Sequence, residues 1–314
     1  MASYFLRRLL LGAAVMLVAM TMLFLLIYAV PGDPATIALG PRASEIQKEF
    51  FRQRMGLDQP LIAQALHFLW ALAHGDLGTD ILSQRPVSQM VLSALPKTLF
   101  LAIFGLGWAA LVGVPLGIWA AMRPNTWIDR IIGLVSTSVV ALPAFLTAIY
   151  GLILFSVQLQ WFPAIGAGQP GDPGDQFHHL VLPAFAVGLA WVGYIARLVR
   201  VSMLETLAEP HVRTYRSYGV SDFRIALRCV LPIAIVPVIS VLGVGMGNLL
   251  SGAVLVEVVF SRPGLGSMAY DAVISRNFPV VLGSVVVTTA LYVVANFLAD
   301  MAIALLDPRL AEKG

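Results

Sequence analysis

The sequence predicts an all-α integral membrane protein with six transmembrane helices and a further helical segment outside the membrane. Of the 314 residues, 59% are apolar and 12% are charged, whereas about 25% are charged in an ordinary soluble domain. The apolar residues also form long runs, instead of the spacing that builds one buried core. These observations exclude a soluble enzyme and a disordered chain. The single cysteine, Cys229, excludes an internal disulfide.

The first apolar run covers residues 9–30 and follows Arg7-Arg8. At about 1.5 Å per residue, it can cross a hydrocarbon core of about 30 Å. The run is longer than the roughly 7–15 apolar residues of a signal peptide, and Pro31-Gly32-Asp33-Pro34 follows it. We therefore expect a retained helix. Five further runs complete the six spans: 98–122, 131–157, 180–196, 233–256 and 280–306.

The basic residues of the short loops predict the orientation. The second and fourth connections are rich in arginine, the third has no Lys or Arg, and the fifth has only two arginines. Because basic loops stay in the cytoplasm, both termini are predicted to be cytoplasmic. The arginines are Arg123 and Arg130 around the second connection, Arg200, Arg213, Arg216, Arg224 and Arg228 around the fourth, and Arg262 and Arg276 in the fifth.

Proline and glycine residues inside the spans predict bent, closely packed helices, although ordinary packing is the alternative for any single position. Proline removes a backbone donor and bends a helix, and glycine lets two helix backbones approach closely. The prolines are Pro115, Pro143, Pro183 and Pro237. The glycines are Gly105, Gly107, Gly113, Gly117, Gly243, Gly245 and Gly247.

The segment 31–96 is predicted to hold short amphipathic helices outside the membrane. Apolar residues recur at helical spacing over 46–55, 61–70 and 87–95. Turns are expected at Gly75-Asp76 and Gly78-Thr79-Asp80. These helices could rest on the outer leaflet, bind a soluble partner or pack against the bundle. The chain thus divides into 1–30 with the first span, the external segment 31–96, a core 97–306 and a cytoplasmic tail 307–314.

The connection between spans four and five, residues 205–232, is predicted to form a helix, a glycine turn and a second helix. We call it the elbow. Pro210 should interrupt the preceding helix, and a short helix over 212–218 should end at Gly219. Ser221 is expected to cap a second helix over 222–231, ahead of Pro232. Its arginines make it a basic knob that could bind anionic lipid or a cytosolic protein.

The sequence contains no recognisable catalytic motif. His-Glu-x-x-His, Cys-x-x-Cys and Gly-x-Ser-x-Gly are absent from the sequence, so we assign no catalytic, cofactor-binding or metal-binding residue. His178-His179 could meet a metal, although adjacent histidines on a loop are usually solvated. The net charge of +3 is small and the arginines lie between apolar runs, so we expect no nucleic-acid partner.

Polar residues in the spans are candidates for a translocation path, because such groups are costly in lipid. Asn248 and Ser251 in span five, with Glu257 near its outer end, could line the path, since neutral donors and one carboxylate suit a zwitterionic peptide. Packing between helices is the alternative for each of them. Asp300, close to the inner end of span six, could instead snorkel or pair with an arginine.

Motifs along the whole chain match the pattern of a known family. The stretch Arg213-Thr214-Tyr215-Arg216-Ser217-Tyr218-Gly219, with Leu231-Pro232 beyond it, resembles the EAA loop of ABC importer permeases of the dipeptide/oligopeptide/nickel family. Further matching motifs are Leu6-Arg7-Arg8-Leu9, Pro31-Gly32-Asp33-Pro34, Gly56-Leu57-Asp58-Gln59-Pro60, Gly75-Asp76-Leu77-Gly78, Gly113-Val114-Pro115-Leu116-Gly117, Ser202-Met203-Leu204-Glu205, Phe260-Ser261-Arg262-Pro263-Gly264-Leu265-Gly266 and Asp307-Pro308-Arg309.

The chain departs from the family pattern at a few positions. Tyr215 and Tyr218 stand where the peptide-transport branch usually has small alanines, and Cys229 stands where the general pattern has Ile. Arg262 stands where the family often has tryptophan, which leaves the local gate or docking chemistry open.

The resemblance implies the type I ABC importer permease fold and one of two membrane subunits of an ATP-driven importer in the inner membrane. Its partners would be a second homologous permease, two cytosolic ATPase subunits, an external solute-binding protein and membrane lipid. The chain lacks the Gly-x4-Gly-Lys-Ser/Thr phosphate loop, so ATP would be used by the ATPase partners and no cofactor is expected here. The resemblance assigns ATPase coupling to Arg213, Thr214, Tyr215, Arg216, Gly219, Asp222, Leu231 and Pro232.

The expected substrate is a small peptide, and a nickel chelate, glutathione or an oligosaccharide is the alternative within the same machinery. A stand-alone secondary transporter is the alternative from a different class. Such a transporter usually carries an internal repeat, and the two halves of this sequence show no convincing one.

Overall fold

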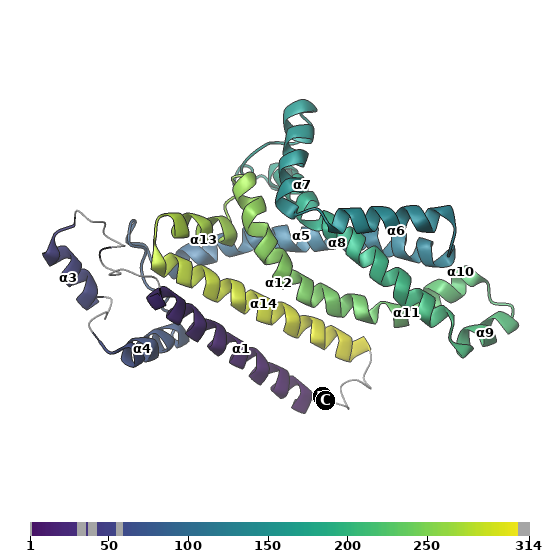
Figure 1. The fold of residues 1–314 in the computed structure, drawn as a ribbon, viewed down its shortest axis with the longest axis horizontal. Helices are drawn as coiled ribbons and strands as arrows, with labels where there is room; N and C mark the ends of the chain where they lie inside the picture. Colours follow the sequence, from purple (N-terminus) through teal and green to yellow (C-terminus); the bar gives the residue numbers. More distant parts are fainter. Residues whose placement is uncertain (1, 30–35, 37–42, 55–58, 307–314) are drawn as a thin grey trace.

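The computed structural model describes residues 2–29, 36, 43–54 and 59–306, and the statements below concern these residues. Figure 1 shows an elongated bundle in which α1, α5, α8, α12 and α14 run lengthwise. The helices are α1 (Ala2–Ala29), α3 (Glu45–Arg54), α4 (Leu61–Ala73), α5 (Val87–Met122), α6 (Trp127–Val140), α7 (Ala144–Gly151), the π-helical η1 (Leu152–Gln158), α8 (Pro173–Leu207), α9 (Pro210–Ser217), α10 (Asp222–Ile225), the π-helical η2 (Ala226–Val230), α11 (Leu231–Ala234), α12 (Val236–Val259), α13 (Leu265–Ile274) and α14 (Phe278–Leu306).

The six predicted spans correspond to four continuous helices and two bent pairs. The helices α1, α5, α8 and α14 are each long and apolar enough to cross a membrane. The third predicted span is bent by 98° between α6 and α7, where Pro143 stands at the N-cap position of α7. The fifth is bent by 42° between α11 and α12. The helices α5 and α8 continue through Pro115 and Pro183.

The predicted short helix over 87–95 is not a separate element, because α5 runs without a break through the second span. Val87, Val91 and Ala94 are buried against α13 and α14, in a cluster with Ala272 and Val280. This packing extends α5 beyond the predicted membrane segment. The fourth predicted span is likewise only the middle of α8, which is 35 residues long.

Glycines allow close contact between α5 and α8, the most extensive helix pair of the bundle. A Cβ on Gly113 would stand 2.9 Å from the carbonyl oxygen of Val192, and one on Gly117 would stand 2.5 Å from that of Ala196. The prediction of close packing is therefore confirmed at both positions. It is wrong at Gly107, where a Cβ would have no heavy atom within 4 Å.

The last span also packs through small residues and one ion pair. Added Cβ atoms on Gly243 and Gly247 would overlap Ala299 and Tyr292 of α14. At the end of the bundle that carries the elbow, Arg8 of α1 lies 3.0 Å from the carboxylate of Asp300. The prediction that Asp300 pairs with an arginine is confirmed, and the pair joins the first and last helices.

The external segment contains the predicted helices α3 and α4, and α4 packs on α1 through Phe68 and Phe24, whose ring centroids are 5.8 Å apart, but one apolar face of α4 is left uncovered. Ile62, Leu66 and Trp70 follow one another on one face of α4 and are exposed. Figure 1 shows α3 and α4 at the end of the bundle opposite the elbow. The predicted turns are present, since Gly75 and Gly78 adopt φ values of +75° and +80°. The motifs at 31–34, 56–58 and 307–309 lie outside the described residues.

Candidate functional site

The elbow is held on the bundle by four buried side chains. Val212 of α9, Ile225 of α10 and Ala226 and Val230 of η2 are almost fully buried, and they pack in one cluster with Met203 near the end of α8. Removing this much apolar surface from water fixes the base of the elbow. The elbow is therefore a rigid projection of the bundle instead of a loose loop.

Gly219 makes the turn of the elbow. Its φ of +74° lies in the left-handed region, which glycine adopts at no steric cost. The amides of Gly219 and Val220 donate to the carbonyl oxygens of Arg216 and Tyr215 at 2.9 and 3.2 Å, which closes the end of α9. The predicted turn at Gly219 is confirmed.

The second half of the elbow differs from the prediction in two details. Ser221 stands at the N-cap position of α10, but its side chain makes no capping hydrogen bond, so the predicted side-chain cap is wrong. The second helix is also predicted to end before Pro232, and this is wrong. The chain continues from α10 through η2 into α11, and Pro232 lies in the first turn of α11, where a backbone N–H would have no partner within the helix.

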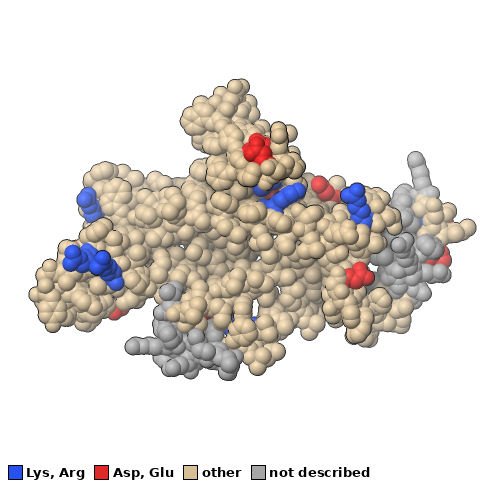
Figure 2. Space-filling model, turned by 180° about the vertical axis from the view of Figure 1, so that it is seen from behind, with Lys and Arg blue, Asp and Glu red and all other residues tan. Residues whose placement is uncertain are grey.

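The outward face of the elbow is basic and aromatic. Tyr218 and Phe223 are 78% and 63% exposed, and Arg216 donates from Nε to Asp222 at 2.9 Å on the surface. In Figure 2 the end of the molecule that carries the elbow shows patches of basic residues. Of the residues assigned to coupling, Arg213, Thr214, Tyr215, Arg216, Gly219, Asp222 and Pro232 are exposed and Leu231 is half-buried.

A partly buried ion pair joins α6 to α8. Arg200 of α8 contacts both carboxylate oxygens of Asp129 in α6, and its Nη2 lies 2.7 Å from Oδ2. Asp129 is 5% exposed. From the sequence, Arg200 is only an orienting charge, because nothing local signals a partner 71 positions away.

At the opposite end of the bundle, a hollow of about 800 Å³ lies among α5, α12, α13 and the turn before α5. Its walls carry both signs of charge: Arg85, Lys97 and Arg262 on the basic side, and Asp80, Glu257 and Asp271 on the acidic side. None of Arg85, Lys97 and Asp271 was singled out from the sequence, because their convergence depends on the packing of three helices.

Asp80 ties the turn before α5 to the junction of α13 and α14. Its carboxylate accepts from the side chains of Ser83 and Asn277 and from the amides of Leu82 and Ser83 at 3.2 and 2.9 Å. Burial alone would raise the pKa of Asp80, but these hydrogen bonds more than offset it, so its pKa is below the ordinary value.

A second, smaller hollow of about 240 Å³ lies beside the first. Its lining includes hydroxyl groups of α5, α12 and α14: Thr98, Ser251, Ser284, Thr288 and Thr289. Between the two hollows, Thr98 donates to Oε1 of Glu257 at 2.7 Å, and the amide of Ser267 donates to Oε2 at 2.9 Å. Glu257 thus fixes the N-terminus of α13 between the two hollows.

The three residues predicted to line a path are not brought together in one hollow. Glu257 is fully buried on the wall of the larger hollow, and Ser251 is exposed on the wall of the smaller one. Asn248 lies in α12, and its side chain is outside the described structure. A role of these residues in the path stays a prediction.

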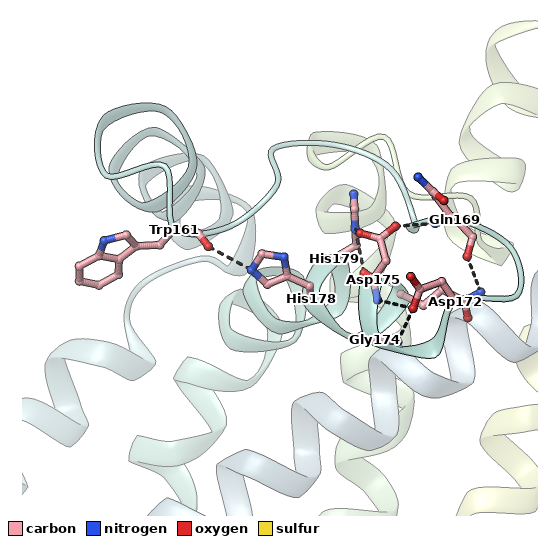
Figure 3. A network of polar contacts seen from close by, with 8 residues as sticks. Trp161, Gln169, Asp172, Gly174, Asp175, His178 and His179 are labelled. Atoms are coloured by element: carbon pink, nitrogen blue, oxygen red, sulfur yellow. Dashed lines mark hydrogen bonds and ion pairs between the residues drawn. The ribbon is translucent and has the colours of Figure 1, made fainter.

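His178 and His179 point to different partners, as Figure 3 shows. Nε2 of His178 lies 3.0 Å from the carbonyl oxygen of Trp161, and Nδ1 of His179 lies 3.2 Å from the carboxylate of Asp175. Both belong to α8, whose N-terminus is capped by Asp172. The part of the chain that the structure describes holds no group of three or more His, Cys, Asp or Glu residues placed to bind a metal ion.

A bundle of membrane-length helices, with a rigid basic elbow at one end and a charged hollow at the other, is the architecture of a multi-pass helical membrane protein. Residues 113–312 match the family described as binding-protein-dependent transport system inner membrane component, and residues 1–102 match its N-terminal family. The chain belongs to this family of multi-pass inner-membrane permeases of ABC importers, which work with ATPase and solute-binding components.

Curated relatives match over the full length. The chain is 36% identical to the glutathione transport system permease protein GsiC of Pectobacterium atrosepticum over 313 residues, which covers 100% of both chains. It is 36% identical to GsiC of Salmonella typhimurium and 34% identical to GsiC of Escherichia coli K12, with the same coverage.

Solved structures confirm the fold. Two inward-facing crystal forms of the MetNI methionine ABC transporter match 69% of this chain and 96% of theirs, with TM-scores of 0.55 and 0.56 and 16% identity. The predicted importer permease fold is therefore correct, and family membership favours an importer subunit over a stand-alone secondary transporter.

Proposed function

We propose that this chain is one of two permease subunits of an importer that carries small peptides inward, with glutathione as the particular peptide that the relatives suggest. Two cytosolic ATPase subunits would drive it and an external binding protein would deliver the peptide. The relatives that match over the full chain are named for glutathione transport. The nickel-chelate and oligosaccharide alternatives stay untested.

The observation that carries the proposal is the construction of the elbow. A device that transmits force needs a stiff base and an accessible outer face. The base is stiff because Val212 and Ile225 are fully buried, while Tyr218 and Phe223 offer exposed aromatic surface beside arginines. Aromatic residues and arginine are enriched where protein interfaces bind most strongly. An ATPase subunit that binds this face would move α8 and α12 together, because the elbow connects these two helices.

The proposed function also predicts how the chain is oriented in the membrane. An ATPase in the cytosol requires the elbow to be cytoplasmic, and the positive-inside rule agrees because Arg213, Arg224 and Arg228 lie there. Arg8 and Asp300 lie at the elbow end of α1 and α14, so both termini would be cytoplasmic as well. The charged hollow then faces the outside, where the binding protein docks.

Replacing Gly219 with valine tests the coupling role. A β-branched residue at φ +74° costs about 1–3 kcal/mol of local strain, so the elbow should lose its shape. We expect ATP-dependent uptake by the assembled transporter and co-purification of the ATPase to fall at least several-fold.

Gly75→Val is the matched control. Gly75 has a φ of +75°, and a Cβ at either glycine would meet no atom within 4 Å, so the two variants carry the same strain at opposite ends. The Gly75 variant should retain the ATPase. Unchanged uptake and unchanged ATPase binding in the Gly219 variant would refute the coupling role.

A further inference from the structure

Arg262 is a buried cation without a hydrogen-bond partner for two of its nitrogens. Its side chain lines the larger hollow and is 5% exposed, and neither Nε nor Nη1 has a partner. Glu257 lies near enough to interact electrostatically with the guanidinium, and its two carboxylate oxygens accept hydrogen bonds from Thr98 and from the amide of Ser267. Among the described residues, no ion pair joins Glu257 to Arg262. Burying a charged donor without hydrogen-bond acceptors is costly, so the guanidinium can still bind an anionic partner through these two nitrogens.

The other charges of the hollow point to the same kind of partner. Lys97 is half-buried and Arg85 exposed on its walls, so three cations face the space. Two of the three carboxylates are already hydrogen-bonded within the protein, Asp80 by Ser83 and Asn277 and Glu257 as described. Asp271 is the remaining carboxylate, and it is exposed at the rim.

We infer that this hollow is a substrate site in which Arg262, with Lys97 and Arg85, binds the carboxylates of a small peptide that carries more carboxylates than ammonium groups. A planar guanidinium binds a carboxylate through two parallel hydrogen bonds. Asp271 is placed to accept the single ammonium group. The volume of about 800 Å³ lies within the range of about 300–1,000 Å³ for small-molecule sites.

The inference rests on the proposed function and specifies its substrate class. An acidic side chain of the binding protein could supply a carboxylate to the same guanidinium. We favour the substrate because Arg262 is only 5% exposed, so a small molecule can reach it more easily than a side chain of a docked protein, which would first meet the exposed Arg85 and Asp271.

The test measures peptide binding directly. The permease pair with its ATPases is placed in nanodiscs without the binding protein, and binding of glutathione, which has two carboxylates and one ammonium group, is measured by equilibrium dialysis. Arg262→Gln should weaken glutathione binding at least tenfold. Glutathione amidated at both carboxyl groups should bind weakly and equally to both proteins. Arg262→Lys keeps the positive charge but cannot make two parallel hydrogen bonds to one carboxylate. Its affinity for glutathione should lie between those of the unaltered protein and Arg262→Gln.

Arg276→Gln is the control, because Arg276 follows α13 but does not line the hollow, and it should bind glutathione like the unaltered protein. ATPase co-purification shows whether each variant is assembled. Equal glutathione binding by unaltered protein and Arg262→Gln would overturn the inference. An Arg262→Gln transporter that binds glutathione normally but no longer retains the binding protein in a separate pull-down would also overturn it. Failure of ATP-dependent peptide uptake in the unaltered complete transporter would instead refute the proposed function.

Discussion

The hydroxyl of Thr98 lies 2.7 Å from Oε1 of Glu257 and 2.8 Å from the backbone nitrogen of Leu265. It donates to the first and accepts from the second, so a single side chain joins α5, α12 and the start of α13. All three groups are buried. This junction lies between the two hollows, and any movement of α13 that connects them has to break it.

Thr98→Val should weaken this junction without changing the size of the side chain. The isostere leaves the Glu257 carboxylate and the Leu265 amide each short of a partner, and hydrogen bonds to charged groups contribute about 1.5–3 kcal/mol. Thermal unfolding of the purified complex in detergent should show a loss of that size. Thr98→Ser keeps the hydroxyl and should restore most of the stability; equal losses in both variants would show that the methyl group matters instead.

The ion pair between Asp129 and Arg200 should contribute more than a surface pair. Asp129→Asn leaves a partly buried guanidinium with one weak acceptor, and we expect a loss of about 1.5–3 kcal/mol in unfolding free energy. Asp222→Asn removes the exposed partner of Arg216 and should cost less than about 1 kcal/mol. Denaturation of the two variants in parallel checks the difference, and similar losses would contradict it.

Asp80 predicts a dependence of stability on pH. Since its pKa is lowered in the folded protein, the carboxylate stabilises the fold fully above its unfolded pKa of about 3.9 and loses that effect as the pH falls through the folded value. Asp80→Asn should therefore be less stable than the unaltered protein at pH 7, and the gap should narrow below about pH 4.

The measurement is the midpoint of thermal unfolding from pH 7 to pH 3. Ser83→Ala removes one hydroxyl donor to Asp80. At pH 7 its unfolding midpoint should differ from that of the unaltered protein by less than the midpoint of Asp80→Asn does, and this difference should also shrink below about pH 4. A gap between Asp80→Asn and the unaltered protein that stays constant over the whole range would mean that packing, and not charge, stabilises this turn.

Apolar periodicity determined the helical class, the number of spans and the position of the elbow, because each depends on the local order of residues. The predicted spans 9–30 and 280–306 fall in α1 and α14 over the residues that the structure describes, and the positive φ of Gly219 follows from a glycine placed between two short helical patterns. The motif series also led to the family, since motifs are local by nature.

The tertiary structure alone decided which distant residues meet. Asp129 and Arg200 are 71 positions apart, and Thr98 and Glu257 are 159 apart, so no periodicity could pair them. Arg85, Lys97 and Arg262 share a hollow because α5, α12 and α13 pack together, which depends on side-chain shapes throughout the bundle. The bend at Pro143 agrees with the sequence, whereas α5 continues through Pro115 and α8 through Pro183, so packing in the bundle decides which prolines interrupt a helix.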